Sequence, residues 1–287
     1  MTKTRTLAAL VMGPLAILAV LFLPTPWLMV LAAVLFLAGL WEWFSLADVE
    51  DTLTRMFLLA ANLLLMVMLV WASRTDRGGS LALFHLAIFI GVIWWCFAAL
   101  WLKFPQFGSH HEGWARAIKL AAGTLSVIPA WCALAVIHGD PGDEGMVGII
   151  PRNHLWLLTA LMMIWMADTG AYFAGRKFGK HKLAPRISPN KTVEGLAGGA
   201  IAAMVFGLIF AMIAGASIAD LPWVALTALI TVAASVVGDL FESMLKRHAG
   251  VKDSSDLIPG HGGILDRMDS VLAALPVFAV CKASFGF

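Results

Sequence analysis

Nine apolar runs follow one another along this chain, and they constrain its fold more than any other feature of the sequence. A run of about 17–25 apolar residues can cross the hydrocarbon core of a bilayer as one helix. A single run could be a buried helix of a soluble protein, but nine in series with only 13% charged residues could not. We therefore predict an all-α, polytopic membrane protein. The predicted spans are Leu7–Leu23, Trp27–Leu46, Met56–Ala72, Ser80–Leu102, Ala117–Ile137, Leu155–Ala174, Val193–Ala214, Trp223–Leu245 and Ile264–Phe285.

The first apolar run follows Lys3 and Arg5, as the apolar part of a signal peptide would. A cleaved signal peptide would need a small-residue cleavage site after the run. The segment Pro24-Thr25-Pro26 instead leads straight into the second run. We therefore expect the first run to be retained as a membrane span.

The basic residues are distributed unevenly between the two sides of the predicted bundle. If the amino terminus is cytoplasmic, the five polar segments on its side carry 16 of the 20 Lys and Arg residues, counting those at span ends. The other side carries only Arg74, Arg77, Arg152 and Lys282. Because cytoplasmic loops of membrane proteins are enriched in Lys and Arg, we predict a cytoplasmic amino terminus. We expect a multi-pass protein of a bacterial-type inner membrane, with its active site toward the cytoplasm.

The chain divides into two regions by the character of its polar residues. Residues 1–155 are spans with short connections, and we interpret them as a membrane-spanning scaffold. In residues 156–287, acidic side chains lie within or at the ends of apolar spans, where an acid costs about 2.5–3.5 kcal/mol near the bilayer centre. These acids are Asp168, Glu194, Asp239, Glu242, Asp266 and Asp269. We therefore predict that residues 156–287 form the catalytic region.

One acid of the scaffold, Glu42, lies within the second apolar run between Trp41 and Trp43. It could be a functional intramembrane acid. It could also be an end-of-helix group in the interfacial zone where tryptophans gather, and we favour this second interpretation.

The densest group of polar residues lies at the end of the eighth span. Asp239, Glu242, Ser243 and Lys246 recur at i, i+3, i+4 and i+7, so on a helix they share one face. A pair of Glu242 and Lys246 could simply stabilise the helix. That alternative leaves Asp239, one turn deeper, unexplained, and we interpret the face as part of an active site.

A glycine-rich segment follows and leads into the ninth span. Gly262 and Gly263 would let the backbone approach a ligand closely, and the helix start after them offers free N–H groups to an anion. Asp266 and Asp269 are one turn apart on that helix. Together with Asp239 they suit Mg²⁺ held against phosphate groups. Helix capping would explain Asp266 or Asp269 singly, but not all three carboxylates.

A second group surrounds the connection from the sixth to the seventh span. Asp168 lies near the end of the sixth span. Ser188 is a suitable N-cap with Pro189 at the first helical position, and Lys191 and Thr192 would then lie in the first turn. Phosphate groups are favoured there by the helix dipole. The basic segment 176–180 could equally rest on anionic lipid headgroups.

These motifs resemble the phosphatidate cytidylyltransferases, also called CDP-diacylglycerol synthases. The family signature reads Ser-x-apolar-Lys-Arg, four residues, Lys-Asp, then Pro-x-His-Gly-Gly-apolar-x-Asp-Arg-apolar-Asp. The motif-level resemblance covers about Trp165–Ser270 and includes the segments around Asp168 and Ser188–Glu194. The signature is matched by Ser243, Lys246, Arg247, Lys252, Asp253, Pro259, His261, Gly262, Gly263, Asp266, Arg267 and Asp269.

The resemblance implies transfer of a cytidylyl group from CTP to phosphatidate, which yields CDP-diacylglycerol and pyrophosphate. Its expected partners are CTP, phosphatidate, membrane lipids and a second copy in a homodimer, and no nucleic acid. The attacking lipid phosphate is already an anion, so no general base is required. The site must instead reduce the repulsion between two anionic substrates, which metal ions and cationic side chains do.

The resemblance also implies roles for individual residues. Asp239 and Asp266 are expected to bind the essential Mg²⁺, with Asp269 completing that site or a second metal site. Lys246 and Arg247 are expected to hold the triphosphate or the departing pyrophosphate. The expected substrate and phosphate contacts are Ser188, Lys191, Thr192, Ser243, Lys252, His261, Gly262, Gly263, Arg267 and Asp168.

Two other functions remain as alternatives at this point. A CTP-dependent lipid kinase would share the nucleotide, but it would need an acid to activate a lipid hydroxyl. A cation-coupled transporter would use the acids as ion ligands. The acids lie at span ends beside Lys, Arg and Gly rather than at mid-span, and no internal repeat is evident, so phosphate chemistry is favoured.

Overall fold

A computed structural model describes residues 2–73, 80–109, 112–140, 145–257 and 262–287, and for residues 2–10 it describes the backbone alone. These residues form nine helices and two short antiparallel hairpins, which confirms the all-α class. The helices are α1 (Thr2–Phe22), α2 (Thr25–Leu46), α3 (Thr52–Ala72), α4 (Ala82–Trp101), α5 (Gly113–His138), α6 (Arg152–Phe178), α7 (Val193–Ile213), α8 (Leu221–His248) and α9 (Leu265–Phe285). The hairpins are formed by β1 (Met146–Val147) with β2 (Ile150–Pro151) and by β3 (Lys182–Ala184) with β4 (Ser188–Thr192).

Eight helices in the described part of the chain are long and apolar enough to span a membrane. They are α2 to α9, and they correspond to the second to ninth predicted spans. In α1 the apolar stretch with described side chains is Val11–Phe22, which is shorter than a full span. The predicted first span begins at Leu7, whose side chain lies outside the described residues. The multi-pass architecture is confirmed.

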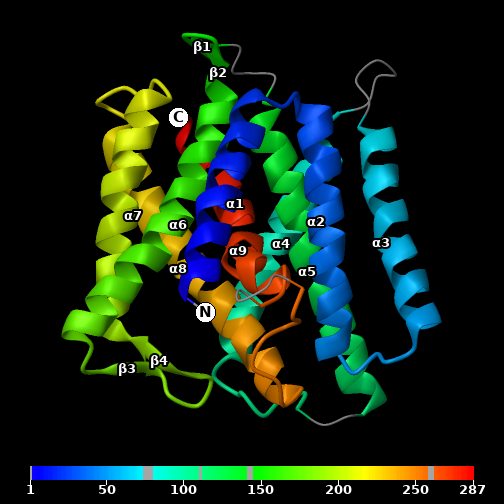
Figure 1. Cartoon of the computed structure of the whole chain (residues 1–287). Helices are drawn as coiled ribbons and strands as arrows, with labels where there is room; N and C mark the ends of the chain where they lie inside the picture. Colours follow the sequence, from blue (N-terminus) through cyan, green and yellow to red (C-terminus); the bar gives the residue numbers. More distant parts are fainter. Residues whose placement is uncertain (1, 74–79, 110–111, 141–144, 258–261) are drawn as a thin grey trace.

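Successive helices run in opposite directions, so their connections alternate between the two ends of the bundle (Figure 1). The start of α1, the turn from α2 to α3, the β3–β4 hairpin and the link from α8 to α9 lie at one end. The β1–β2 hairpin lies at the other end. The first end is the one to which the sequence assigns 16 of the 20 Lys and Arg residues, and we call it the basic end.

Helix α9 runs through the middle of the bundle, where it contacts α2, α4, α5, α6 and α8 (Figure 1). Its central side chains are buried, and the indole N–H of Trp95 in α4 donates to the Leu272 carbonyl at 3.1 Å. Since α9 starts at the basic end, its first two turns bring Asp266 and Asp269 to that end of the bundle.

Helices α6 and α7 approach each other closely because glycines line their contact. A side chain at Gly170 would lie 2.8 Å from the Gly198 carbonyl oxygen, and one at Gly199 would lie 2.6 Å from the Ala167 carbonyl oxygen. Larger residues would therefore push the two helices apart. Close contact through small residues is a common way for helices to associate in lipid, where burial of apolar surface gives little driving force.

The predicted start of α7 is wrong. Ser188 was expected to cap this helix with Pro189 at its first position, but both residues belong to strand β4, and the helix begins at Val193. A proline disfavours helical backbone in the residue before it, which suits Ser188 to the extended conformation. Thr192 is the observed cap, and its hydroxyl oxygen accepts a hydrogen bond from the Gly195 N–H at 3.1 Å.

Candidate active site

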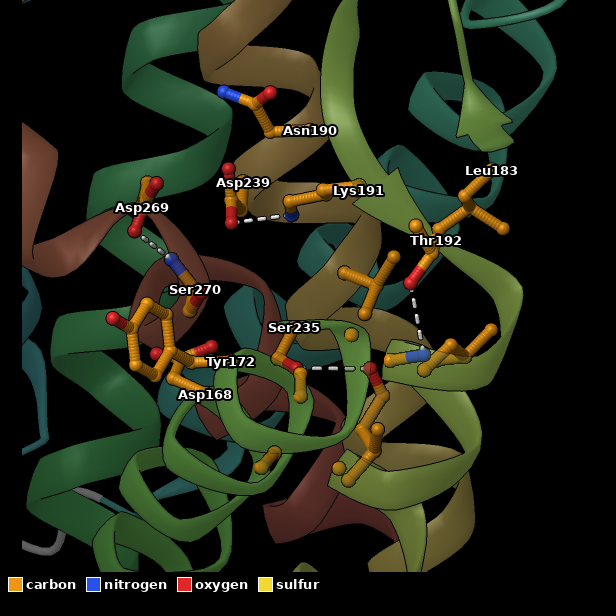
Figure 2. Close-up of a pocket in the computed structure, with 18 of the residues that line it drawn as sticks. Asp168, Tyr172, Leu183, Asn190, Lys191, Thr192, Ser235, Asp239, Asp269 and Ser270 are labelled. Atoms are coloured by element: carbon orange, nitrogen blue, oxygen red, sulfur yellow. Dashed lines mark hydrogen bonds and ion pairs between the residues drawn. The ribbon is translucent and has the colours of Figure 1, made fainter. Parts of the chain in front are cut away.

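A cavity of about 860 Å³ lies among α6, strand β4, α7, α8 and the start of α9. Figure 2 shows several of its side chains, which come from elements far apart in the sequence. The cavity therefore brings together the two groups of polar residues that the sequence keeps separate. The predicted site residues that line it are Asp168, Lys191, Thr192, Asp239, Lys246, Asp266, Arg267 and Asp269.

The contact between the two groups is an ion pair of Lys191 in β4 with Asp239 in α8 (Figure 2). Both side chains are about one-quarter exposed, so the pair borders the cavity rather than lying in the core. The other carboxylate oxygen of Asp239 accepts a long hydrogen bond of 3.4 Å from the Ser243 hydroxyl, one helical turn away. Lys191 thus places a positive charge between the β3–β4 hairpin and the acidic face of α8.

Lys246 lies between two carboxylates at the end of α8. Its ammonium group forms an ion pair with Glu242, one turn earlier, and a hydrogen bond of 2.5 Å with Asp266 in α9. The three side chains are almost entirely buried, with Glu242 only 1% exposed. The helix-stabilising pair considered from the sequence is therefore present, but it is one part of a buried cluster that joins α8 to α9.

The second oxygen of Asp266 holds the link between α8 and α9. It accepts hydrogen bonds from the Ser254 backbone N–H at 2.9 Å and the Gly263 N–H at 2.8 Å. It also lies 2.8 Å from the Ser254 hydroxyl, whose single proton is shared between Asp266 and Glu42. Both oxygens of Asp266 are thus engaged with protein groups. Its position in the cavity wall is fixed by these contacts, and its predicted role as a metal ligand stays a prediction.

Asp168 and Asp269 complete the acidic wall of the cavity beside Asp239 (Figure 2). One oxygen of Asp269 accepts a hydrogen bond of 2.6 Å from the Ser270 N–H. The carboxylates of Asp168, Asp239 and Asp269 are near enough to repel one another electrostatically. Bound cations would relieve this repulsion, and carboxylate oxygens are suitable Mg²⁺ ligands. Within the described residues, however, no three acidic, His or Cys side chains converge as a ready-made metal site.

Positive charge in the cavity wall comes from Lys191, Lys246, Arg267 and Arg176. Arg176 was assigned from the sequence only to a basic segment that could rest on lipid headgroups. Its guanidinium donates to the Tyr172 hydroxyl at 3.3 Å, and both side chains line the cavity. The cavity therefore combines an acidic wall with cationic groups, which suits phosphate-bearing ligands and the metal ions that accompany them.

The remaining predicted site residues lie outside the cavity wall. Arg247 donates to the backbone carbonyls of Ile187 at 3.4 Å and Val251 at 3.3 Å, so its guanidinium joins the hairpin to the end of α8. Ser188 pairs with Ala184 in the hairpin. His261 lies outside the described residues. Ser243, Lys252, Gly262 and Gly263 are also absent from the described cavity lining. Their roles toward substrates stay predictions.

Two glutamates hold the loops that form the cavity. Glu194, in the first turn of α7, accepts hydrogen bonds from the backbone N–H groups of Lys180 at 3.1 Å and His181 at 3.2 Å. It also pairs with the His181 ring at 2.6 Å. These contacts fix the entry to the β3–β4 hairpin. The sequence placed Glu194 in the motif around Ser188–Glu194, but it did not indicate that this side chain holds the hairpin.

The favoured interpretation of Glu42 as a plain end-of-helix group does not account for its contacts. Glu42 lies one turn before the end of α2, but its side chain is buried and only 4% of the residue is exposed. Its carboxylate accepts hydrogen bonds from residues in the middle of the α8–α9 link and from the start of α9. An isolated acid between two tryptophans was the only available signal, and it could not reveal partners more than 200 residues away.

Known proteins similar to this chain identify its family. The sequence model of the cytidylyltransferase family matches residues 3–285. A phosphatidate cytidylyltransferase of Pseudomonas aeruginosa is 37% identical over 295 residues, which cover 100% of this chain and 99% of that protein. One of Haemophilus influenzae is 36% identical over 97% of this chain and 98% of that protein. One of Bacillus subtilis is 50% identical over 45% of this chain. The chain therefore belongs to the cytidylyltransferase family.

Proposed function

We propose that the chain transfers a cytidylyl group from CTP to phosphatidate, which yields CDP-diacylglycerol and pyrophosphate. The observation that carries this proposal is the cavity in which Asp239, Asp266, Asp269 and Lys191 come together from α8, α9 and the hairpin. The full-length relatives from Pseudomonas aeruginosa and Haemophilus influenzae, both named phosphatidate cytidylyltransferase, support it. In the reaction, an oxygen of the lipid phosphate bonds to the α-phosphorus of CTP. The bond from that phosphorus to the bridging oxygen breaks, and pyrophosphate leaves.

The side chains of the cavity act by positioning and by charge. Lys191, Arg176 and Arg267 lower the repulsion between two phosphate-bearing substrates and hold them in contact. The lipid phosphate is an anion before it attacks, so the reaction needs no side chain to remove a proton. Lys246 is held by Glu242 and Asp266, and this fixed ammonium group is suited to the charge that develops on the leaving pyrophosphate.

We propose Mg²⁺ as the cofactor, with Asp239 and Asp266 as its ligands and Asp269 completing that site or a second metal site. All three side chains line the cavity, and Asp239 and Asp266 each have a lysine ammonium group against them. Each ammonium group stands where a cation could interact with the carboxylate, so Mg²⁺ would share these oxygens with the lysines or displace them. When bound, the metal supplies charge neutralisation at the phosphate oxygens. Asp168 is proposed to orient the nucleotide or a neighbouring cation.

We further propose that the basic end faces the cytoplasm of a bacterium, with the protein in the inner membrane. The concentration of Lys and Arg at this end supports that orientation. CTP is then available on the side where the β3–β4 hairpin and the α8–α9 link lie. A homodimer is proposed as the assembly, and cross-linking in native membranes tests it. No nucleic-acid partner is proposed.

One incubation tests the proposed reaction. Purified protein is supplied with Mg²⁺, phosphatidate and CTP labelled in the α-phosphate, and both products are identified. Labelled CDP-diacylglycerol together with pyrophosphate is expected. Release of CDP with a phosphorylated lipid would instead indicate a CTP-dependent kinase. Cation transport by reconstituted protein without CTP consumption would indicate a transporter.

A further inference from the structure

Glu42 lies on α2, in the scaffold half of the chain, yet its carboxylate is bonded to the proposed catalytic segment. It accepts hydrogen bonds from the hydroxyls of Ser254 at 2.8 Å and Ser255 at 2.6 Å. It also accepts from the backbone N–H groups of Ile264 at 3.1 Å and Leu265 at 2.8 Å. These four donors, of which the Ser254 hydroxyl is shared with Asp266, account for the burial of the Glu42 charge, which would otherwise be costly.

Two of these donors are the first N–H groups of α9. The N–H groups of a first helical turn have no partner within their own helix and need one from elsewhere. Ile264 occupies the N-cap position, and its aliphatic side chain cannot supply that partner. Glu42 therefore acts as the cap of α9 from another helix. Its negative charge is also favoured at the positive end of the α9 dipole.

The other two donors lie in the middle of the α8–α9 link. Ser254 and Ser255 precede the glycine-rich segment, whereas Ile264 and Leu265 follow it, so one carboxylate holds both ends of this part of the signature. Gly263 packs against the same group, since a side chain at this position would collide with the Ser254 hydroxyl and the Glu42 carboxylate. The contact thus explains why the segment carries a glycine here without reference to any ligand.

The geometry points to Glu42 as a positioning residue for the cytidylyl transfer. It fixes the start of α9, and Asp266 and Asp269 project from the first turns of that helix into the cavity wall. Ser254 also donates to Asp266 through its backbone N–H, so Glu42 and Asp266 hold the same residue from two sides. Glu42 does not line the described cavity and acts through these neighbours. This inference rests on the proposed function.

Glu42→Gln tests the inference with little change of shape. The amide has one acceptor oxygen and replaces the other with an NH₂ donor, so two of the four donors lose their acceptor. We expect kcat to fall by about tenfold or more, because small misplacements of reacting groups cost that much. We expect the KM for CTP to change by less than about threefold. Hydrogen exchange at the Ile264 and Leu265 amides should become faster.

Asp51→Asn is the matched control. Asp51 caps α3 near the end of the same α2 helix, where it accepts hydrogen bonds from the Thr54 N–H and hydroxyl, and it lies outside the proposed catalytic cavity. This variant should keep kcat within about twofold of the wild-type value and leave exchange at the start of α9 unchanged. A folded Glu42→Gln protein with wild-type kcat would overturn the inference, even if its melting temperature were lower.

A milder variant keeps the test decisive if Glu42→Gln does not fold. Ser255→Ala removes one of the four donors and leaves both backbone donors in place, so a fall in kcat of about twofold to tenfold is expected. A wild-type kcat for this variant would then overturn the inference. If the wild-type protein itself makes no CDP-diacylglycerol, the proposed function fails, whereas the exchange measurement still reports whether Glu42 holds the start of α9.

Discussion

Replacing Lys246 with methionine should strongly destabilise the protein. Lys246 is the shared cation of Glu242 and Asp266, and the exposed fractions of the three side chains are 11%, 1% and 7%. Water therefore screens the charges of these three side chains only weakly. Methionine has a similar length but no charge, so Lys246→Met would leave two buried carboxylates facing one another. Removing one partner of a buried ion pair costs about 3–5 kcal/mol, and we expect a loss of free energy of unfolding of that size.

The measurement is a denaturant titration of the purified protein in mixed micelles, with Lys103→Met as the control. Lys103 is exposed in the connection after α4, so its replacement should change the free energy of unfolding by less than about 0.5 kcal/mol. A double-mutant cycle with Glu242→Gln then isolates the interaction between Glu242 and Lys246. Because the pair is in direct contact and buried, we expect a coupling energy of about 1–3 kcal/mol.

Two results would refute this reasoning. If Lys246→Met unfolds at the same denaturant concentration as Lys103→Met, the three buried side chains do not depend on one another as the structure indicates. If the free energy of unfolding lost by the double mutant equals the sum of the losses in the two single mutants, the pair of Glu242 and Lys246 contributes no interaction energy of its own. Either result would also remove the argument that the Lys246 ammonium group is held in a fixed position for the leaving pyrophosphate.

Other predictions concern the acidic wall and the start of α7. Alanine at any of the three proposed metal ligands should lower kcat by about 100-fold or more in inserted protein, and near-normal CTP-dependent activity in all three variants would contradict their assignment. These ligands are Asp239, Asp266 and Asp269. Thr192→Val removes the observed cap of α7 and should cost about 1 kcal/mol in unfolding free energy, whereas Ser188→Ala should cost less than about 0.5 kcal/mol. Equal losses in denaturant titrations would contradict the observed helix start.

The helices of this protein could be predicted from the sequence because lipid imposes a simple rule. Every backbone polar group inside the hydrocarbon must be bonded within its own segment, so long apolar runs become helices whatever surrounds them. The runs that became α2 to α9 follow this rule. The face formed by Asp239, Glu242 and Lys246 could be predicted for a related reason, since helical periodicity alone places these residues together. Both inferences need only local information.

The region between α6 and α7 could not be predicted in the same way. Both Ser188-Pro189 and Thr192 are acceptable starts of a helix, and local preferences do not choose between them. The choice is made by strand β3, which pairs with β4 and keeps the segment before Thr192 extended. This pairing places Lys191 on a strand instead of in a first helical turn. Its ammonium group meets Asp239 as a result, and not the dipole of α7.

The cavity wall depends on two loops, and a glutamate outside each loop holds it. Glu194 binds the backbone at the entry to the β3–β4 hairpin, which carries Lys191. Glu42 binds the middle of the α8–α9 link and the start of α9, which carries Asp266. In each case a carboxylate accepts hydrogen bonds from backbone N–H groups that have no partner in a regular element. The groups around Glu42 are buried or half-buried, where an unpaired N–H would be costly. Acids in and around the cavity therefore serve two distinct purposes. Those that line the cavity are suited to cations and phosphate chemistry, and those behind it fix the loops. The sequence alone does not separate the two kinds, because the distinction depends on which donors the folded chain brings to each carboxylate.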